Sequence, residues 1–548
     1  MRLLRYARKY VHLRAVSEAV SSIEAHPMLA NTVGYNPLML WWGGVLLSVL
    51  VTFLSFPPFP LGILMLVGMT PLFLALETAK STRQAFFRAW LYVLIGNSAI
   101  CFWVAHTMHQ FAGLPWILSY PCVALLSVFE QSAWPLWAGI RHWSRDKLGK
   151  LPLFWSPCLL MFLDYLWPKF FPNTLGNAFY TIPWLSQAAD LFGVVGLTGL
   201  IVLTNEALAL SILKRPGWKR EALSAGIAFV SIGAYGVARL HQVRRISPKE
   251  SVKIAVVQPN INPVAAVREA SDKHQARLDM LQPLLRLSRE IVKEKPDLLF
   301  WPETSVSNTF RSQDENETLT VTQGIEAFQK ETQIPLLFGA RDRQQENLYN
   351  TLFLLDGPSL QRYYKHKLLW LGESIPLVSW IPALASTLKK QGATNFSPGP
   401  GPLVFTWKGF TLRPLICLEG LYSDYVNASP ADLIVSATND AWFGTGQEPA
   451  LHLYLTAFRA IENRTPILRS TTTGYSALIG LDGQMIWRSE LGEEVAKTLE
   501  VPLYPKIFSL YRYWGALPVW FSLAWVLWPF LRKRNLRGTL NFLSRTPP

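Results

Sequence analysis

Long apolar stretches separated by short polar loops fill residues 37–240 and return once near the end of the chain. A helix that crosses the hydrocarbon core of a membrane needs about 20 apolar residues. The pattern predicts a polytopic α-helical bundle of about eight transmembrane helices, at 38–56, 61–77, 87–105, 115–139, 152–170, 191–213, 222–240 and 513–531. Residues 245–505 lack such stretches, and we expect one large water-facing domain there.

The water-facing domain contains short apolar runs that alternate with amphipathic stretches. Strands are expected near 252–257, 297–300, 335–340, 350–355, 433–437, 466–471 and 475–480, with one more ending at Cys417. Helices are expected at 273–294, near 321–332 and near 449–463. Strands interleaved with helices in this way are typical of an α/β domain.

Lysine and arginine concentrate in every second loop between the predicted spans. The basic segments are 1–36, 78–85, 141–150, 214–220 and the tail after 531, whereas the loops 57–60, 106–114 and 171–190 contain neither residue. Because positively charged loops stay in the cytoplasm, both termini are predicted to lie there. Seven spans then place the large domain on the opposite side, although Arg244 and Arg245 lie on that side too.

The predicted organisation has four parts. These are a basic cytoplasmic arm (1–36), a seven-helix transmembrane domain (37–243), a large domain outside the cytoplasm (244–508), and a last transmembrane helix with a basic cytoplasmic tail (509–548). Only 16% of the residues are charged, against about 25% in a typical soluble protein. The net charge of +15 is explained by the basic loops, so we expect no nucleic-acid partner.

The cysteines and the short motifs narrow the chemistry. Four cysteines are too few and too scattered for a disulfide framework, and Cys101, Cys122 and Cys158 lie inside apolar segments. The sequence has no CxxC, no HExxH, no clustered histidines and no glycine-rich phosphate loop. We therefore expect neither a metal ion nor a diffusible cofactor.

Three reactive residues each follow a strand-like run in the water-facing domain: Glu303 in Trp-Pro-Glu, Lys365 in Tyr-Tyr-Lys-His-Lys, and Cys417 in Ile-Cys-Leu-Glu. A thiol is mostly protonated at neutral pH, and its thiolate is the nucleophile. A carboxylate can take the thiol proton, and a lysine ammonium can stabilise an oxyanion. Spacing alone does not show that the three residues converge, and a lone cysteine is more often a small buried hydrophobe.

Two loops of this domain are unusually apolar for a water-facing setting. They either form buried core or contact the membrane surface and line a lipid-binding groove. The residues concerned are Trp370, Leu371, Ile375, Trp380, Ile381, Trp442 and Phe443.

The order Trp-Pro-Glu, Lys-x-x-Leu and Cys-x-Glu resembles the nitrilase (carbon–nitrogen hydrolase) superfamily, whose Glu-Lys-Cys triad sits on a four-layer α-β-β-α sandwich. The flanking residues are similar to those of the apolipoprotein N-acyltransferases. The segments that carry this resemblance are 364–368, 371–377, 438–444, 459–462, 468–474 and, in the membrane part, 187–198.

The resemblance implies a two-step transfer in a bacterial inner membrane, by a monomer with its catalytic domain in the periplasm. Cys417 would take an acyl chain from a phospholipid as a thioester, and the amino group of a lipoprotein's N-terminal diacylglyceryl-cysteine would then receive it. Glu303 would be the general base, and Lys365 would hold the oxyanion together with the backbone N–H of Leu418. Glu373 and Glu419 would support the triad or simply be satisfied carboxylates.

Some residues depart from the family pattern or leave alternatives open. Leu418 stands where an aromatic residue is usual, Val267 where tryptophan is usual, and Asp164 where glutamate is usual. The carboxylates Glu130, Asp164 and Glu206 lie inside predicted spans, where they are either functional or structural. Two other functions stay open: a membrane-tethered amidase that passes its acyl group to water, and an inert lipid-binding or transport protein.

Overall fold

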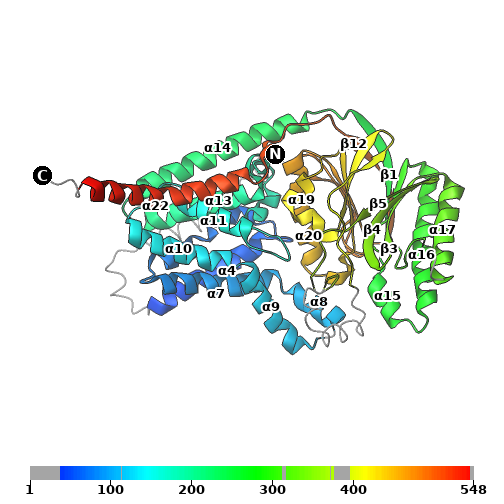
Figure 1. Cartoon of the computed structure of the whole chain (residues 1–548), viewed down its shortest axis with the longest axis horizontal. Coiled ribbons are helices and arrows are strands. Elements are labelled where there is room, and N and C mark those ends of the chain that lie inside the picture. Colours follow the sequence, from blue (N-terminus) through cyan, green and yellow to red (C-terminus); the bar gives the residue numbers. More distant parts are fainter. Residues whose placement is uncertain (1–36, 113, 312–315, 371, 375–394, 544–548) are drawn as a thin grey trace, which may run out of the picture.

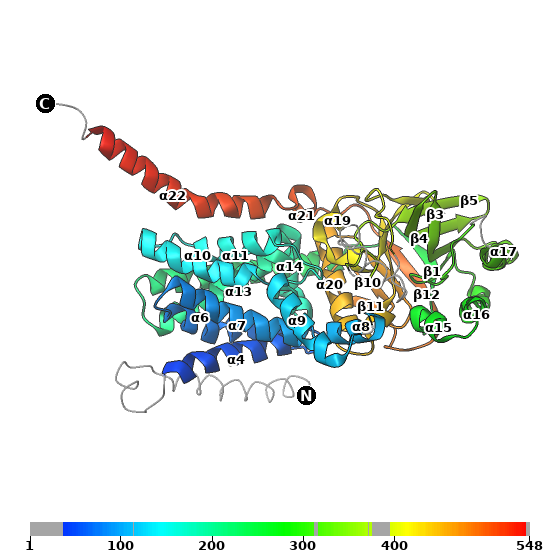
Figure 2. The same cartoon turned by 60° about the horizontal axis from the view of Figure 1, so that its bottom comes forward.

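The chain folds into a helical bundle with a mixed α/β domain attached to one end (Figures 1 and 2). The computed structural model describes residues 37–112, 114–311, 316–370, 372–374 and 395–543. The predicted arm 1–36 lies outside the described residues. In both views the domain continues the long axis of the bundle, so one end of the bundle faces protein while its sides stay free.

The bundle is built from helices that match the apolar stretches of the sequence. Those before the domain are α4 (Pro37–Ser55), α5 (Met65–Gly68), α6 (Thr70–Glu77), α7 (Thr82–Ile100), α8 (Trp103–Ala112), α9 (Trp116–Glu130), α10 (Ala133–Leu148), α11 (Trp155–Leu166), α12 (Pro183–Ser186), α13 (Ala189–Ile212) and α14 (Trp218–Arg244). The helices after the domain are α21 (Leu510–Trp514) and α22 (Leu517–Leu543). Two 3-10 turns, η1 (Gly62–Leu64) and η2 (Leu175–Thr181), complete this part.

Four predicted spans are divided between two or more helices: 61–77, 87–105, 115–139 and 513–531. The span 87–105 breaks after Ile100, where α8 leaves α7 at an angle of 61°, and this bend lets Trp103 pack edge-on against Phe171 and Phe443. The span 115–139 divides into α9 and α10. A continuous helix would need an N–H at residue 135 to reach the carbonyl of residue 131, and Pro135 has none.

By length and composition, two helices of the described residues can cross a membrane, α13 and α14, or three if the bent pair α7 and α8 counts as one span. The other apolar helices are shorter or carry charges at one end. Apolar membrane-type helices are therefore present, and the total of eight stays a prediction.

The carboxylates predicted inside the spans all have partners. Glu130 accepts hydrogen bonds from the backbone N–H groups of Phe170 and Phe171, both at 2.8 Å. Asp164 pairs with Lys169 at 2.7 Å. Glu206 belongs to a buried ion cluster with Glu77, Arg141 and Arg145, in which the Arg141–Glu206 contact is 2.7 Å. These contacts support structural roles for the three carboxylates.

Two six-stranded sheets form the centre of the domain. The first has the order β12-β1-β2-β3-β4-β5 and the second β11-β10-β9-β8-β7-β6. Their strands are β1 (Glu250–Gln258), β2 (Leu298–Phe300), β3 (Leu336–Gln344), β4 (Asn347–Asp356), β5 (Ser359–Tyr364), β6 (Phe405–Trp407), β7 (Phe410–Ile416), β8 (Leu433–Thr438), β9 (Ile467–Thr471), β10 (Ala477–Ile479), β11 (Met485–Arg488) and β12 (Val495–Leu503). The predicted strands are present, and β5 is the strand-like run expected before Lys365, while β6, β11 and β12 were not anticipated.

Helices cover the outer face of each sheet, which gives the α-β-β-α order that the resemblance implied (Figure 1). The first sheet packs its outer apolar side chains against α16 (Lys273–Ile291) and α17 (Asn316–Thr332). The second packs against α19 (Ser423–Asn427) and α20 (Glu448–Asn463). One continuous apolar cluster fills the space between the sheets and extends into the bundle. The remaining elements are α15 (Pro263–Glu269) and the 3-10 turns η3 (Val292–Glu294), η4 (Cys417–Leu421) and η5 (Asp440–Phe443).

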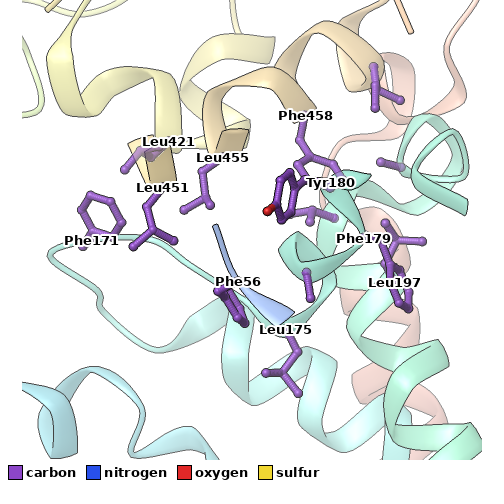
Figure 3. Packing of buried hydrophobic residues seen from close by; sticks show 14 of the residues in the cluster. Phe56, Phe171, Leu175, Phe179, Tyr180, Leu197, Leu421, Leu451, Leu455 and Phe458 are labelled. Atoms are coloured by element: carbon purple, nitrogen blue, oxygen red, sulfur yellow. The ribbon is translucent and has the colours of Figure 1, made fainter. Parts of the chain in front are cut away.

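The junction between bundle and domain is apolar at its centre. Leu451, Leu455 and Phe458 project from α20 toward the bundle (Figure 3). The bundle side meets them with side chains from the end of α4, the loop before η2 and η2 itself, namely Phe56, Phe171, Leu175, Phe179 and Tyr180. Burying these side chains favours one fixed arrangement of the two parts.

A buried ionic clamp strengthens one side of this junction. The carboxylate of Asp190, at the start of α13, lies 2.6 Å from the Arg464 guanidinium of the domain and 2.8 Å from Arg239 of α14. Arg464 also donates to the side-chain oxygen of Gln187 at 2.6 Å. Removing one member would leave a buried charge without its partner, which is costly.

Candidate active site

Glu303 lies just beyond the end of β2, in a tight turn that packs closely against β3. Its side chain is buried, and the following Thr304 has a φ of 53°. A Cβ on Gly339 would lie 2.7 Å from the Cα of Glu303, closer than real atoms approach. The glycine therefore allows β3 to approach the turn that carries the carboxylate.

The strand directions place Lys365 at the same sheet edge as Glu303. β2 runs parallel to β3, β4 is antiparallel to β3, and β5 is antiparallel to β4. It follows that β2 and β5 point the same way, and that residues just after their ends meet at one edge. Such edges are where open α/β sheets place their functional residues.

Lys365 joins two carboxylates in a buried cluster. Its Nζ lies 3.2 Å from Oε1 of Glu303 and 2.8 Å from Oε2 of Glu373. The side-chain amide of Asn350 donates to both carboxylates, at 2.8 Å and 2.7 Å. The second oxygen of Glu303 accepts the backbone N–H of Asn439 at 2.8 Å. One lysine ammonium thus faces two carboxylates.

Cys417 follows β7 of the other sheet in a sharp, strained turn. It is buried and has a φ of 53°, a left-handed conformation that costs a non-glycine residue about 1–3 kcal/mol. Strain of this kind persists only where the surroundings hold it. The thiol is close enough to the cluster that Glu303, Lys365 and Glu373 all act on its pKa.

Glu419 ties the cysteine turn to the lysine segment. One carboxylate oxygen accepts the backbone N–H groups of His366 and Lys367, at 2.8 Å and 3.1 Å. The other accepts the backbone N–H of Ile416 at 2.8 Å and the hydroxyl of Tyr363 at 2.6 Å. Glu419 therefore connects the two sheets beside the site.

The environment of the cluster shifts its pKa values in a direction suited to proton transfer. Burial raises the pKa of Glu303, the Lys365 ammonium opposes this, and Glu373 adds to it. Burial acts to lower the pKa of Lys365, but Glu303 and Glu373 outweigh it and raise the pKa well above its usual range. Burial, with Glu303, raises the pKa of the Cys417 thiol well above its ordinary value. A raised pKa favours the neutral thiol, and a neutral thiol acts as a nucleophile only when a base takes its proton.

A second buried network, formed by His452, Asp440 and Arg469, contacts the backbone of the cysteine turn. Sequence analysis did not predict it. His452 of α20 donates through Nε2 to the Cys417 carbonyl at 3.2 Å, and its Nδ1 lies 3.0 Å from Asp440. Arg469 of β9 contacts the same Asp440 carboxylate at 2.8 Å. His452 falls within a predicted helix, and only its place in the fold shows that it reaches Cys417.

Asp440, His452 and Glu448 offer ligand atoms within 4.8 Å of one another, as a metal site would. Asp440, however, is already paired with the Arg469 guanidinium. Burial, with the nearby Asp440, raises the pKa of Glu448 well above its ordinary value, which favours a neutral carboxyl. A neutral acid and a carboxylate already bound to a cation are poor ligands, and we assign no metal to this cluster.

The apolar loops have different positions. Trp370 is 53% exposed and meets Phe170 edge-on. Phe443 is buried against Trp103 of α8, and the neighbouring Trp442 accepts a hydrogen bond from Thr107 at its carbonyl, 3.0 Å long. Leu418 is buried as well. The predicted lipid-contact residues Leu371, Ile375, Trp380 and Ile381 lie outside the described residues.

Comparison with known proteins matches both parts of the chain. Residues 48–207 match the family model described as the apolipoprotein N-acyltransferase N-terminal domain, and residues 253–503 match the carbon-nitrogen hydrolase model. Among solved structures, an amidase from Nesterenkonia sp. aligns over 47% of this chain and 93% of its own, with 20% identity and a TM-score of 0.35.

Curated relatives align over nearly the whole chain. Apolipoprotein N-acyltransferase of Bdellovibrio bacteriovorus is 29% identical over 91% of this chain and 94% of its own length. Apolipoprotein N-acyltransferase of Geobacter metallireducens is 30% identical over 89% of this chain and 93% of its own length. The chain therefore belongs to the apolipoprotein N-acyltransferase family.

Proposed function

We propose that this protein moves a fatty acyl chain from a membrane phospholipid to the N-terminal amino group of a diacylglyceryl-cysteine lipoprotein. The observation that carries the proposal is the buried cluster of Glu303, Lys365 and Glu373 beside the strained turn of Cys417. It supplies a nucleophile, a base and a cation, as acyl transfer requires. Family membership supports an N-acyltransferase over the amidase and the inert protein.

In the first step Glu303 acts as general base toward Cys417. The carboxylate takes the thiol proton, and the sulfur attacks the carbonyl carbon of the phospholipid's acyl ester. The ester C–O bond then breaks, the lysophospholipid oxygen takes the proton from Glu303, and the acyl chain remains on Cys417 as a thioester. The raised pKa of Glu303 suits this exchange, because a base is most effective when its pKa approaches the working pH.

Lys365 has the position and charge to stabilise the tetrahedral intermediate. Its ammonium is held by two carboxylates and is kept protonated by them. The backbone N–H of Leu418, immediately after the nucleophile, is the second donor in the proposal. Donors fixed before the reaction cost little reorganisation when negative charge develops on the carbonyl oxygen.

In the second step the free α-amino group of the lipoprotein attacks the thioester. Glu303 accepts a proton from the amine, the C–S bond breaks, and Cys417 leaves as a thiolate that recovers its proton from Glu303. The product is an amide, and the enzyme returns to its starting state. This double displacement requires no metal and no cofactor.

For the membrane arrangement we propose eight spans, with both termini in the cytoplasm and the domain 244–508 in the periplasm. The alternation of basic loops supports this orientation. The domain caps one end of the bundle (Figure 2), and in the proposed arrangement a site at the junction lies at the height of a lipid headgroup layer. The half-exposed Trp370 suits contact with that layer. We propose a monomer as the working unit.

The proposal is tested by intact mass of the purified protein after incubation with phospholipid, with and without a diacylglyceryl-cysteine peptide. We expect a fatty-acyl adduct on Cys417 that disappears as the peptide gains an amide. An adduct lost to water but never to the peptide would indicate the tethered amidase. No adduct with any acyl ester would reject the transferase.

A further inference from the structure

A cavity of about 850 Å³ lies where the bundle meets the domain. One wall comes from residues 164–174, which include the end of α11, and another from residues 366–368 and 421–425. The volume is within the range of small-molecule sites. Much of the lining is aromatic, including Phe129, Trp167, Phe170, Trp370, Tyr422 and Tyr425.

Within the described part of the chain, three cationic side chains line this cavity, and two of them are paired with carboxylates. Lys169 pairs with Asp164 at 2.7 Å, and Arg459 pairs with Glu462 at 3.0 Å. Lys367 has no carboxylate within ion-pair distance among the residues that the structure describes. The half-buried Lys367 therefore brings an uncompensated positive charge into the cavity.

The ammonium of Lys367 is held between two aromatic rings. It lies 5.5 Å from the ring centre of Tyr422 and 5.8 Å from that of Tyr425. Its backbone N–H is fixed by Glu419, which also fixes the cysteine turn. The charge is thus positioned relative to the catalytic cluster by the same carboxylate that connects the two sheets.

The other polar groups of the cavity do not satisfy this charge. Asp424 accepts the hydroxyl of Tyr165, and its position on the wall disfavours a phosphate there. The imidazole Nδ1 of His366 contacts the Gly399 carbonyl at 2.6 Å. Among the cationic side chains that the structure describes on this wall, Lys367 is the one without an ion-pair partner, and it favours an anion.

We propose that Lys367 binds the phosphate of the phospholipid acyl donor, so that this cavity is the headgroup subsite of the enzyme. The inference rests on the proposed function. An ammonium and a phosphate form charge-assisted hydrogen bonds, which are about twice as strong as neutral ones. Lys367 is two residues from Lys365 in the chain, and in this proposal the glycerol esters of the bound lipid extend from the phosphate toward the catalytic cluster. The aromatic walls suit the apolar part of a lipid that enters from the bilayer.

The test compares two acyl donors with the same chains in detergent micelles, using the full-length protein. Dioleoylphosphatidylglycerol carries the phosphate, and dioleoylglycerol carries the same esters without it. Intact mass gives the rate of acyl-Cys417 formation as the donor fraction varies. The variants are Lys367→Gln and Lys367→Arg, with Lys330→Gln on the exposed face of α17 as the control.

We expect Lys367→Gln to raise the half-saturating phosphatidylglycerol fraction by about 10- to 100-fold while the maximal rate stays within about twofold. Kinetics with dioleoylglycerol should be unchanged, Lys367→Arg should recover most of the affinity, and Lys330→Gln should match wild type. The ratio between the two donors is read within one variant, so a loss of folded protein does not change it.

An unchanged donor ratio in Lys367→Gln, or equal weakening of both donors, would overturn the headgroup subsite. If inorganic phosphate competes with dioleoylglycerol in wild type but not in Lys367→Gln, and the two donors saturate alike, the site serves free phosphate and the lipid assignment is wrong. A wild-type protein that acylates Cys417 while Lys367→Gln behaves normally rejects only this subsite. A wild type that forms no adduct with either donor rejects the proposed function itself.

Discussion

Two buried ion clusters in this protein both pair basic side chains with glutamates, and they differ in the numbers of cations and carboxylates. In the bundle, Arg141 and Arg145 face Glu77 and Glu206, two cations for two anions. In the domain, Lys365 alone faces Glu303 and Glu373. In the balanced cluster each carboxylate is paired with arginine, which suits a fixed structural contact between helices. The unbalanced cluster has one carboxylate more than it has cations, which suits the proposed role of Glu303 as a proton acceptor.

The two clusters also differ in what surrounds them. The Glu303 cluster adjoins a neutral thiol on a strained turn, and residues beside it line a cavity of about 850 Å³. The Arg141 cluster lies among packed helices α6, α10 and α13. Buried ion pairs by themselves are weak evidence for function. Charge excess next to a nucleophile and a cavity is the combination that indicates chemistry.

The largest expected effect is the loss of the nucleophile. Cys417→Ser should lower the rate of acyl transfer by about 10⁴-fold or more, because a hydroxyl is a far weaker nucleophile than a thiol at this site. Intact mass after incubation with phospholipid should show no thioester. Cys101→Ser, in the bundle, is the matched control and should acylate normally. Acylation of Cys101 in place of Cys417 would contradict the assignment of the nucleophile.

Removing the base should have the next largest effect. Glu303→Gln keeps the hydrogen bond acceptor for Asn350 but cannot take a proton, and we expect acyl-enzyme formation to slow by about 10²- to 10⁴-fold. Single-turnover kinetics with a phospholipid donor measure this rate. If Glu303→Gln retained more than about a tenth of the wild-type rate, another group would have to be the base.

The pH dependence of the acylation rate should show how the negative charge of Glu373 affects the pKa of Glu303. Glu303 must be ionised to act, so the rate should fall as the pH drops through its pKa. Because burial and Glu373 raise that pKa, the fall should occur at higher pH than for an ordinary glutamate, whose pKa is about 4.3. Glu373→Gln removes one negative charge and should move this acid limb to lower pH. An acid limb at the same pH in Glu373→Gln would show that charge balance does not tune the base.

The smallest effect on catalysis is expected in the bundle. Glu206→Gln leaves Arg141 and Arg145 with one carboxylate fewer and should lower the stability by about 1–3 kcal/mol. Thermal unfolding of the protein in detergent measures this loss. The acid limb of the pH–rate profile should coincide with that of wild type. A shifted acid limb would contradict a purely structural role for the bundle cluster.

The sequence by itself determined the division of the chain and the identity of its reactive residues. The apolar stretches predicted helices near every long helix of the bundle but not the short α12, and the alternation of runs predicted an α/β domain. Such patterns are readable because hydrophobic periodicity is a local property of each element. The motifs around Glu303, Lys365 and Cys417 carried the family resemblance, although their convergence was implied by that resemblance and not by their spacing.

Only the tertiary structure decided which residues meet. Glu303 and Lys365 end strands of one sheet and Cys417 ends a strand of the other, so their approach depends on how two sheets stack through a shared core. The roles of Asn350 and His452 have the same origin, since each contacts residues at least 23 positions away. The absence of an acidic partner for Lys367 among the described residues likewise depends on how the bundle and domain join. Contacts between distant segments follow from packing, which no local pattern in the sequence encodes.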